Sequence, residues 1–217
     1  DEKVGLKNTL IVLSADHGTP EVPGYLNEFG IRAGYVDPAS WDKEPGFMAL
    51  KNKFGIDREL IESYSHPYLY LDHEVIRQHG LDQREVEQTV AKELLKFAGV
   101  AQAVSSSELR EGNLPDTQIN RAVLDNFNPN RSGDIYLVFE PHWFINDFDG
   151  LTVAATHGSP WRYDTFVPIA FGGMQIPAQH VHRRVHTTDI APTLASFLGI
   201  KPPSGAAGEP LLELLPR

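Results

Sequence analysis

A short apolar run near the start of the chain is the feature that most constrains the fold. Residues 9–13 read TLIVL and pass directly into SADHG at residues 14–18. An unbroken run of aliphatic and β-branched residues is typical of a strand buried on both faces of a parallel sheet. In α/β folds, ligands collect just beyond the carboxyl ends of such strands. The sequence therefore predicts an α/β fold with Asp16 and His17 at its functional edge.

The composition limits the possible partners and metal ligands. The 217 residues are 41% hydrophobic and 22% charged, which is typical of a packed globular protein with one large or two small domains. The formal net charge of -10 argues against general binding to nucleic acid or to an anionic membrane, because both need a cationic surface. No apolar run is long enough to span a membrane. Since the chain has no cysteine, any metal must be held by imidazole and carboxylate groups.

A second polar constellation lies far downstream. Residues 155–160 read ATHGSP, with His157 between Thr156 and a glycine, and Asp164 follows in a Tyr-Asp-Thr sequence. Taken alone, each constellation has an ordinary structural interpretation, as a capped turn or as a loop histidine with local partners. The interpretation of His157 as an ordinary loop histidine becomes less favoured once the two segments are read together.

The middle of the chain predicts a separate α+β lobe. Its expected order is strand, helix, strand, helix, strand, at residues 68–71, 82–99, 100–104, 117–127 and 135–139. We expect this lobe to occupy residues 65–140 as an insertion between two parts of a core, residues 1–40 and 141–217. Residues 19–41 are expected to form a long irregular loop, and residues 43–61 to be partly helical.

The last segment predicts a return to the core. Residues 168–171 (PIAF) are expected to form another short apolar strand. Thr187-Thr188-Asp189 is expected to start a helix that ends at Gly199, because hydroxyl and acidic side chains favour a helix N-terminus and glycine favours its end.

These segments resemble a known family. SADHG, THGSP, YDT, VPIAF and TTDIAPTL, in this order, look like the C-terminal half of bacterial alkaline phosphatases. The closest resemblance is to the branch grouped with type I phosphodiesterases and nucleotide pyrophosphatases. The matching segments fall within residues 10–30 and 130–210. The resemblance implies an alkaline-phosphatase-like sheet with flanking helices.

The resemblance also implies a metal centre with two zinc ions. It places Asp16 and His17 on the zinc that holds the nucleophile, and His157 on the zinc that activates water. Asp164 or Thr156 is expected to orient the His157 ring. The nucleophilic Thr or Ser of the family, and an Asp-x-x-x-His pair, have no counterpart before Asp16. We therefore expect this chain to be part of a larger enzyme and to be inactive without its N-terminal half.

Several alternatives remain open at this point. The intact enzyme could be a sulfatase or phosphonate hydrolase of the same superfamily, or the chain could be a noncatalytic metal-binding module. The expected partners are a small phosphate ester and the missing N-terminal half, and the resemblance implies a periplasmic or extracellular location. Asp72-His73, which we expect in a strand of the lobe, and the histidines of HVHRRVH (His180, His182 and His186) are weaker ligand candidates.

Overall fold

The computed structural model describes residues 2–148, 150–174 and 176–215 and divides the chain into two compact units. The smaller unit is formed by Asp1–Asp16 and Val167–Arg217, and the larger unit by His17–Phe166. The sequence-based division into a core (1–40 and 141–217) and a lobe (65–140) stays a prediction.

The helical elements, α-helices and 3-10 helices (η), are η1 Leu6–Asn8, α1 Pro23–Glu28, η2 Pro38–Lys43, α2 Pro45–Phe54, α3 His73–Gln78, α4 Gln83–Leu94, α5 Ser106–Glu111, α6 Gln118–Asn126, α7 Arg162–Thr165, η3 Thr187–Asp189, α8 Ile190–Leu198 and η4 Leu212–Leu214. The strands are β1 Leu10–Ser14, β2 Gly34–Tyr35, β3 Ile61–Ser65, β4 Tyr68–Leu71, β5 Val100–Ser105, β6 Ile135–Phe139, β7 Trp143–Phe144, β8 Asp147–Phe148, β9 Leu151–Thr152 and β10 Ile169–Gly173.

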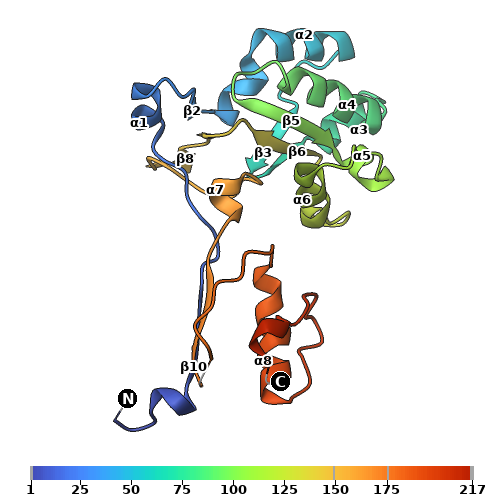
Figure 1. Cartoon of the computed structure of the whole chain (residues 1–217). Helices are drawn as coiled ribbons and strands as arrows, with labels where there is room; N and C mark the ends of the chain where they lie inside the picture. Colours follow the sequence, from blue (N-terminus) through green and yellow to red (C-terminus); the bar gives the residue numbers. More distant parts are fainter. Residues whose placement is uncertain (1, 149, 175, 216–217) are drawn as a thin grey trace. The chain divides into compact units, whose positions relative to one another are not determined.

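A four-stranded antiparallel sheet with helices on both faces organises the larger unit. Its strand order is β3-β4-β6-β5. Figure 1 labels β3, β5 and β6 of this sheet. Side chains of β6 alternate between two apolar clusters, because successive residues of a strand point to opposite faces. Ile135, Leu137 and Phe139 join the cluster that contains the apolar residues of α2, α3 and α4. Tyr136 and Val138 join the cluster that contains residues of α5 and α6. The expected α+β lobe is therefore a three-layer structure.

Helix α4 illustrates how local sequence signals produce this packing. The Asp82 carboxylate accepts a hydrogen bond from the Glu85 amide and caps the helix. Val86, Val90 and Leu94 recur at helical spacing and are fully buried against the sheet. The helix ends at Leu94 rather than continuing to residue 99.

The Asp72-His73 pair does not lie in a strand, so that expectation was wrong. The Asp72 carboxylate caps α3 by accepting the Val75 amide, and His73 is the first residue of that helix. His73 Nε2 lies 2.8 Å from Oδ1 of the buried Asp134, which also accepts the Leu71 amide. The pair therefore fixes the start of α3 to the sheet.

The predicted long loop at residues 19–41 was also partly wrong. It contains α1, begun by Pro23, and the short strand β2, which pairs in parallel with β7. Proline at the first position of a helix is favourable, because its fixed φ suits the helix and its missing amide is not needed there. The expected loop is thus built from short elements.

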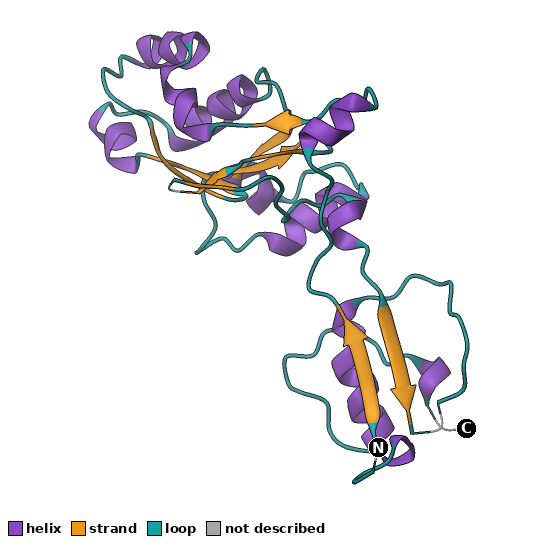
Figure 2. Cartoon of the chain, turned by 90° about the vertical axis from the view of Figure 1, so that its left-hand side faces the viewer, coloured by secondary structure: helices purple, strands orange, loops and turns teal. Residues whose placement is uncertain are grey.

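The smaller unit contains a two-stranded sheet in which β1 pairs antiparallel with β10 (Figure 2). The strand at the TLIVL run is confirmed, but the expected parallel sheet with two buried faces is not found among the described residues. β1 and β10 together form a two-stranded ribbon. Ile11 is 49% exposed and Leu13 is 63% exposed, so the face of this ribbon to which they point is not buried.

The helix predicted after Thr187 is present as η3 and α8. Gly199 follows α8 in the left-handed conformation and ends it, as expected. The Asp189 carboxylate accepts the amides of His186 and Glu209, and so fixes the start of the helix to the tail. Among the described residues, every helix is too short or too polar to cross a membrane.

Candidate metal centre

Two histidines that are far apart in the sequence meet in the larger unit. The rings of His17 and His157 lie with centroids 3.4 Å apart and are nearly parallel, at 9°. His17 Nδ1 lies 2.7 Å from the Gly18 carbonyl oxygen. Because a carbonyl oxygen only accepts, Nδ1 carries the proton in this contact, and Nε2 keeps the lone pair that a metal requires. His17 is therefore held in a tautomer suited to metal binding.

Gly18 joins the SADHG segment to the segment that carries Asp164. Its amide donates to the Asp164 carbonyl oxygen over 2.7 Å. A Cβ atom at this position would lie 1.9 Å from the Tyr163 carbonyl oxygen. Glycine is thus required at position 18, because the two backbone segments pack too closely for a side chain.

Asp164, expected near the site as a partner of His157, anchors the loop that carries this histidine. Its Oδ2 accepts the Ser159 amide at 2.8 Å and the Ser159 hydroxyl at 2.6 Å. The side chain belongs to α7 and is only 4% exposed. Its other oxygen, Oδ1, is buried and has no hydrogen-bond donor among the described residues. The carboxylate therefore fixes the residue two positions after His157 and keeps one acceptor unused.

His66, which sequence reasoning missed, borders the same loop. Its Nε2 lies 3.1 Å from the Gly158 carbonyl oxygen, and its Nδ1 lies 2.7 Å from the Tyr64 hydroxyl. Desolvation by burial lowers the pKa of His66, against the opposing effects of the Gly158 hydrogen bond and the Asp164 charge. No local pattern in the sequence marks His66, because its contact with Gly158 joins segments far apart in the chain.

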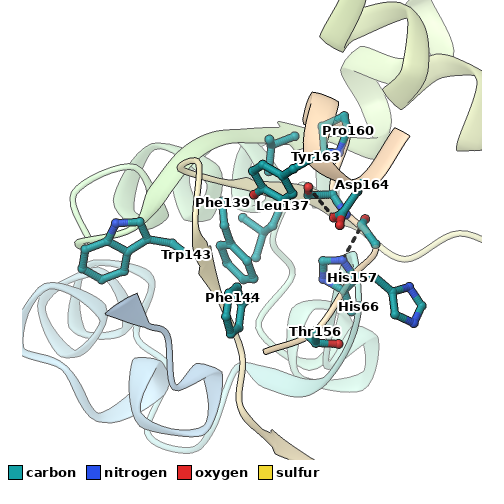
Figure 3. Close-up of a pocket in the computed structure, with 13 residues that line it drawn as sticks. His66, Leu137, Phe139, Trp143, Phe144, Thr156, His157, Pro160, Tyr163 and Asp164 are labelled. Atoms are coloured by element: carbon teal, nitrogen blue, oxygen red, sulfur yellow. Dashed lines mark hydrogen bonds between the residues drawn. The ribbon is translucent and has the colours of Figure 1, made fainter. Parts of the chain in front are cut away.

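A small pocket is lined in part by His66, His157 and Asp164 (Figure 3). Its volume is about 10 Å³, comparable to the space that one water molecule needs. The polar part of its lining is formed by His66, Thr156, His157, Ser159 and Asp164. The apolar part includes Leu137 and Phe139 of β6, so the sheet of the lobe forms one wall of the pocket.

The donor set fits a metal only in part. Imidazole nitrogen is a common zinc ligand, and His17 presents Nε2 in the required form. Within residues 2–148, 150–174 and 176–215, however, no three His, Asp or Glu side chains are arranged to hold one metal ion. Asp16 is the last residue of the smaller unit and is exposed. The chain thus offers single ligands rather than a complete coordination shell.

The histidines of HVHRRVH do not form a metal site in the part of the chain that is described. His180 and His182 are exposed, with ring centroids 6.4 Å apart. His186 precedes η3, where its backbone amide donates to Asp189. All three histidines are thus exposed in this segment.

Comparison with known proteins reveals relatives along the whole chain. The chain is 34% identical over 215 residues to a protein named calcium-transporting ATPase from Myroides odoratus. It is 33% identical over 218 residues to alkaline phosphatase PafA from Elizabethkingia meningoseptica, and 26% identical over 224 residues to alkaline phosphatase PhoV from Synechococcus elongatus. These matches cover 99%, 100% and 99% of this chain, respectively. No protein-family model matches the sequence.

The fold is also that of a solved relative. The structure matches a crystal structure of wild-type alkaline phosphatase PafA with a TM-score of 0.82 and 32% identity, over 100% of this chain and 40% of that chain. The first two curated relatives are likewise covered over only 38% of their own length. The similarity therefore extends over all of this chain and over less than half of its relatives.

Proposed function

This chain belongs to the alkaline phosphatase superfamily, and we propose that it is the C-terminal portion of a phosphate-ester hydrolase that uses two zinc ions. The observation that carries the proposal is the contact between the rings of His17 and His157, at 3.4 Å. Two-metal hydrolases place their ions a few Å apart, so ligands of different ions must approach each other closely. Two histidines brought together from distant segments meet this requirement.

The proposed ligands are those implied by the resemblance. Asp16 and His17 would hold the zinc that also binds the nucleophile, and His157 would hold the second zinc. The two ions would supply positive charge for the phosphoryl oxygens and the leaving oxygen, and would lower the pKa of the attacking hydroxyl. The remaining ligands and the nucleophile would come from the part of the relatives that this chain does not cover.

The residues around His157 would keep it in place. The carboxylate of Asp164 fixes Ser159 by two hydrogen bonds, which restricts the loop that carries His157. The unused Oδ1 of Asp164 is a suitable acceptor for the ring N–H of His157 when the other ring nitrogen binds zinc. Thr156 lines the same pocket and is the alternative acceptor. A histidine oriented in this way would be a better ligand, because its tautomer and direction are fixed.

The names of the relatives guide the choice of substrate. Two of the reported relatives are named alkaline phosphatases, which favours a phosphate monoester as the first substrate to test. A third is named an ATPase, so ATP, whose terminal phosphate is also released by phosphoryl transfer to water, should be tested beside it. The family resemblance adds two further predictions. One is phosphodiesterase or nucleotide pyrophosphatase activity, and the other is a periplasmic or extracellular location.

The test is a comparison of zinc content and hydrolysis. The full-length product of the gene and the 217-residue chain would be assayed with a chromogenic phosphate monoester, a chromogenic diester and ATP. We expect only a protein that contains the nucleophile to bind about two zinc ions and to turn over. His157→Ala should abolish turnover and lower the zinc content, while His182→Ala, at an exposed histidine, should change neither.

Three other outcomes would change or reject the proposal. If the full-length protein binds zinc but cleaves sulfate esters instead, the chain belongs to a sulfatase of the same superfamily. If it binds zinc and hydrolyses none of these esters, a noncatalytic metal-binding role replaces the enzyme. If it binds no zinc at all, the proposed metal centre is wrong.

A further inference from the structure

A tyrosine and a histidine at the end of β3 form a hydrogen-bonded chain that reaches the loop that carries His157. Tyr64 lies in β3, and His66 follows directly after this strand. The Tyr64 hydroxyl lies 2.7 Å from His66 Nδ1. His66 Nε2 lies 3.1 Å from the Gly158 carbonyl oxygen, a contact drawn as a dashed line in Figure 3. All of these residues belong to the larger unit, so the connection runs within one compact body.

The direction of these two hydrogen bonds follows from the chemistry of the groups. The Gly158 carbonyl only accepts, so His66 Nε2 must carry the proton. In a neutral imidazole the other nitrogen, Nδ1, then accepts, and the Tyr64 hydroxyl donates to it. Burial raises the pKa of Tyr64 far above its ordinary value, so this hydroxyl keeps its proton. The chain of donors therefore runs from Tyr64 through His66 to the Gly158 carbonyl.

Packing holds His66 in this position as firmly as the hydrogen bonds do. Its ring stacks on Phe139, the last residue of β6, with centroids 6.0 Å apart. On the other side, a Cβ atom on Gly158 would lie 2.9 Å from His66 Nε2. Gly158 also has a φ of 110°, which side chains with a Cβ rarely adopt. Glycine at position 158 is therefore required twice, once for its own backbone and once for the close approach of His66.

The loop after His157 is consequently fixed from two directions. His66 holds the carbonyl of Gly158, and Asp164 holds the amide and hydroxyl of Ser159. The Gly158 carbonyl and the Ser159 amide belong to one peptide unit, which begins one residue after His157 and is thus held at both of its polar groups. The orientation of the His157 side chain depends on this backbone.

We propose that Tyr64 and His66 are positioning residues for the metal ligand His157, through the hydrogen bond of His66 to the Gly158 carbonyl. This inference rests on the proposed function, since it takes His157 as a zinc ligand. It gives the lobe a role in the metal centre: the end of β3 supports the ligand loop. Residues that orient a ligand typically change metal affinity by about 10- to 100-fold when they are removed.

The experiment uses the full-length protein and measures zinc affinity by competition with a chromogenic chelator, beside the urea midpoint of each variant. The variants are His66→Ala, His66→Gln and Tyr64→Phe. Glutamine can donate to the Gly158 carbonyl through its amide nitrogen and accept from Tyr64 through its oxygen. The matched control is His79→Ala, because His79 Nδ1 also contacts a backbone carbonyl, that of Val75, at 2.8 Å.

We expect His66→Ala to weaken zinc binding by about 10-fold or more. The zinc affinity of His66→Gln should lie close to that of wild type. Tyr64→Phe should lower the zinc affinity by less than His66→Ala does. His79→Ala should leave zinc affinity unchanged, whatever its effect on the urea midpoint. NMR of the ring nitrogens should find the proton of His66 on Nε2.

Zinc affinity equal to that of wild type in folded His66→Ala or Tyr64→Phe would overturn the inference. So would a loss in His66→Gln as large as in His66→Ala, or a His66 proton on Nδ1. Failure of the wild-type protein to bind zinc would instead reject the proposed metal centre. If His66→Ala does not fold, Tyr64→Phe and His66→Gln still decide the question, because each keeps most of the packing.

Discussion

The two hydrogen bonds that Asp164 accepts from Ser159 allow a quantitative prediction for two substitutions. Asp164→Ala removes both bonds, at 2.8 Å and 2.6 Å, and leaves the Ser159 amide without this partner. Hydrogen bonds to a charged group contribute about 1.5–3 kcal/mol each, and the two share one acceptor. Ser159 is partly exposed, so water replaces some of the loss. We therefore expect Asp164→Ala to lower the free energy of unfolding by about 2–4 kcal/mol.

Asp164→Asn should cost much less than Asp164→Ala. The amide oxygen of asparagine can occupy the place of Oδ2 and accept the same two hydrogen bonds from Ser159. Its amide nitrogen would replace Oδ1, which has no donor among the described residues, so no bond is lost there. Bonds to a neutral acceptor are weaker, and we expect a loss of about 1 kcal/mol.

The assay is urea denaturation of the chain, followed by circular dichroism and tryptophan fluorescence. Trp161 lies near the loop and donates through its indole nitrogen to the Phe139 carbonyl, so its emission reports on this region. Asp125→Asn, at an exposed position, is the control for the loss of one negative charge and should leave the midpoint unchanged. A loss below about 0.5 kcal/mol for Asp164→Ala would refute the argument from hydrogen bonds. Equal losses for alanine and asparagine would show that the charge, and not the acceptor geometry, stabilises the loop.

Three further predictions concern the tail, the core and the ribbon. The hydrogen bond from Arg183 lowers the pKa of Glu213 from its ordinary 4.5 to about 2, so the stabilisation from this pair is complete above pH 4.5 and is lost as the pH falls towards 2. An NMR titration should find this low pKa, and Arg183→Ala should return it towards 4.5. Phe47 is fully buried, and Phe47→Ala should lower the free energy of unfolding by about 3–5 kcal/mol in urea, unless the cavity collapses completely. Gly173 has a φ of 83° and no room for a Cβ atom, which would lie 1.9 Å from a backbone oxygen, so Gly173→Ala should speed amide hydrogen exchange in β1. Gly172→Ala, where the Cβ position is open, should not; equal effects would contradict this explanation.

Local signals in the sequence predicted most of the regular structure. Asp82 and Thr117 cap their helices through side-chain hydrogen bonds to the third residue that follows, as short polar side chains before an apolar stripe predict. The strand at residues 135–139 was also predicted from its unbroken apolar run, and all five of its residues are buried. The cap of α5 was missed, although Ser105 and Glu108 form a capping box that the sequence displays.

Features that depend on distant partners were harder to predict. The antiparallel pairing of β1 with β10 cannot be read from an apolar run, since the run has the same composition in either kind of sheet. The contact of His17 with His157 was anticipated only through the family resemblance. Tyr64 and His66 were not anticipated, because a hydrogen bond to a backbone carbonyl leaves no pattern in the sequence.

The two-stranded ribbon has a practical consequence for handling the isolated chain. β1 has one strand partner among the described residues, so its other edge presents unpaired backbone amides and carbonyls. The run at residues 9–13 contains no charge and no proline, and Ile11 and Leu13 are exposed beside that edge. Uncharged, β-prone edges of this kind pair readily with copies of themselves. Solutions of the 217-residue chain should therefore become turbid as the concentration rises, and a lysine in place of Leu13 should keep them clear.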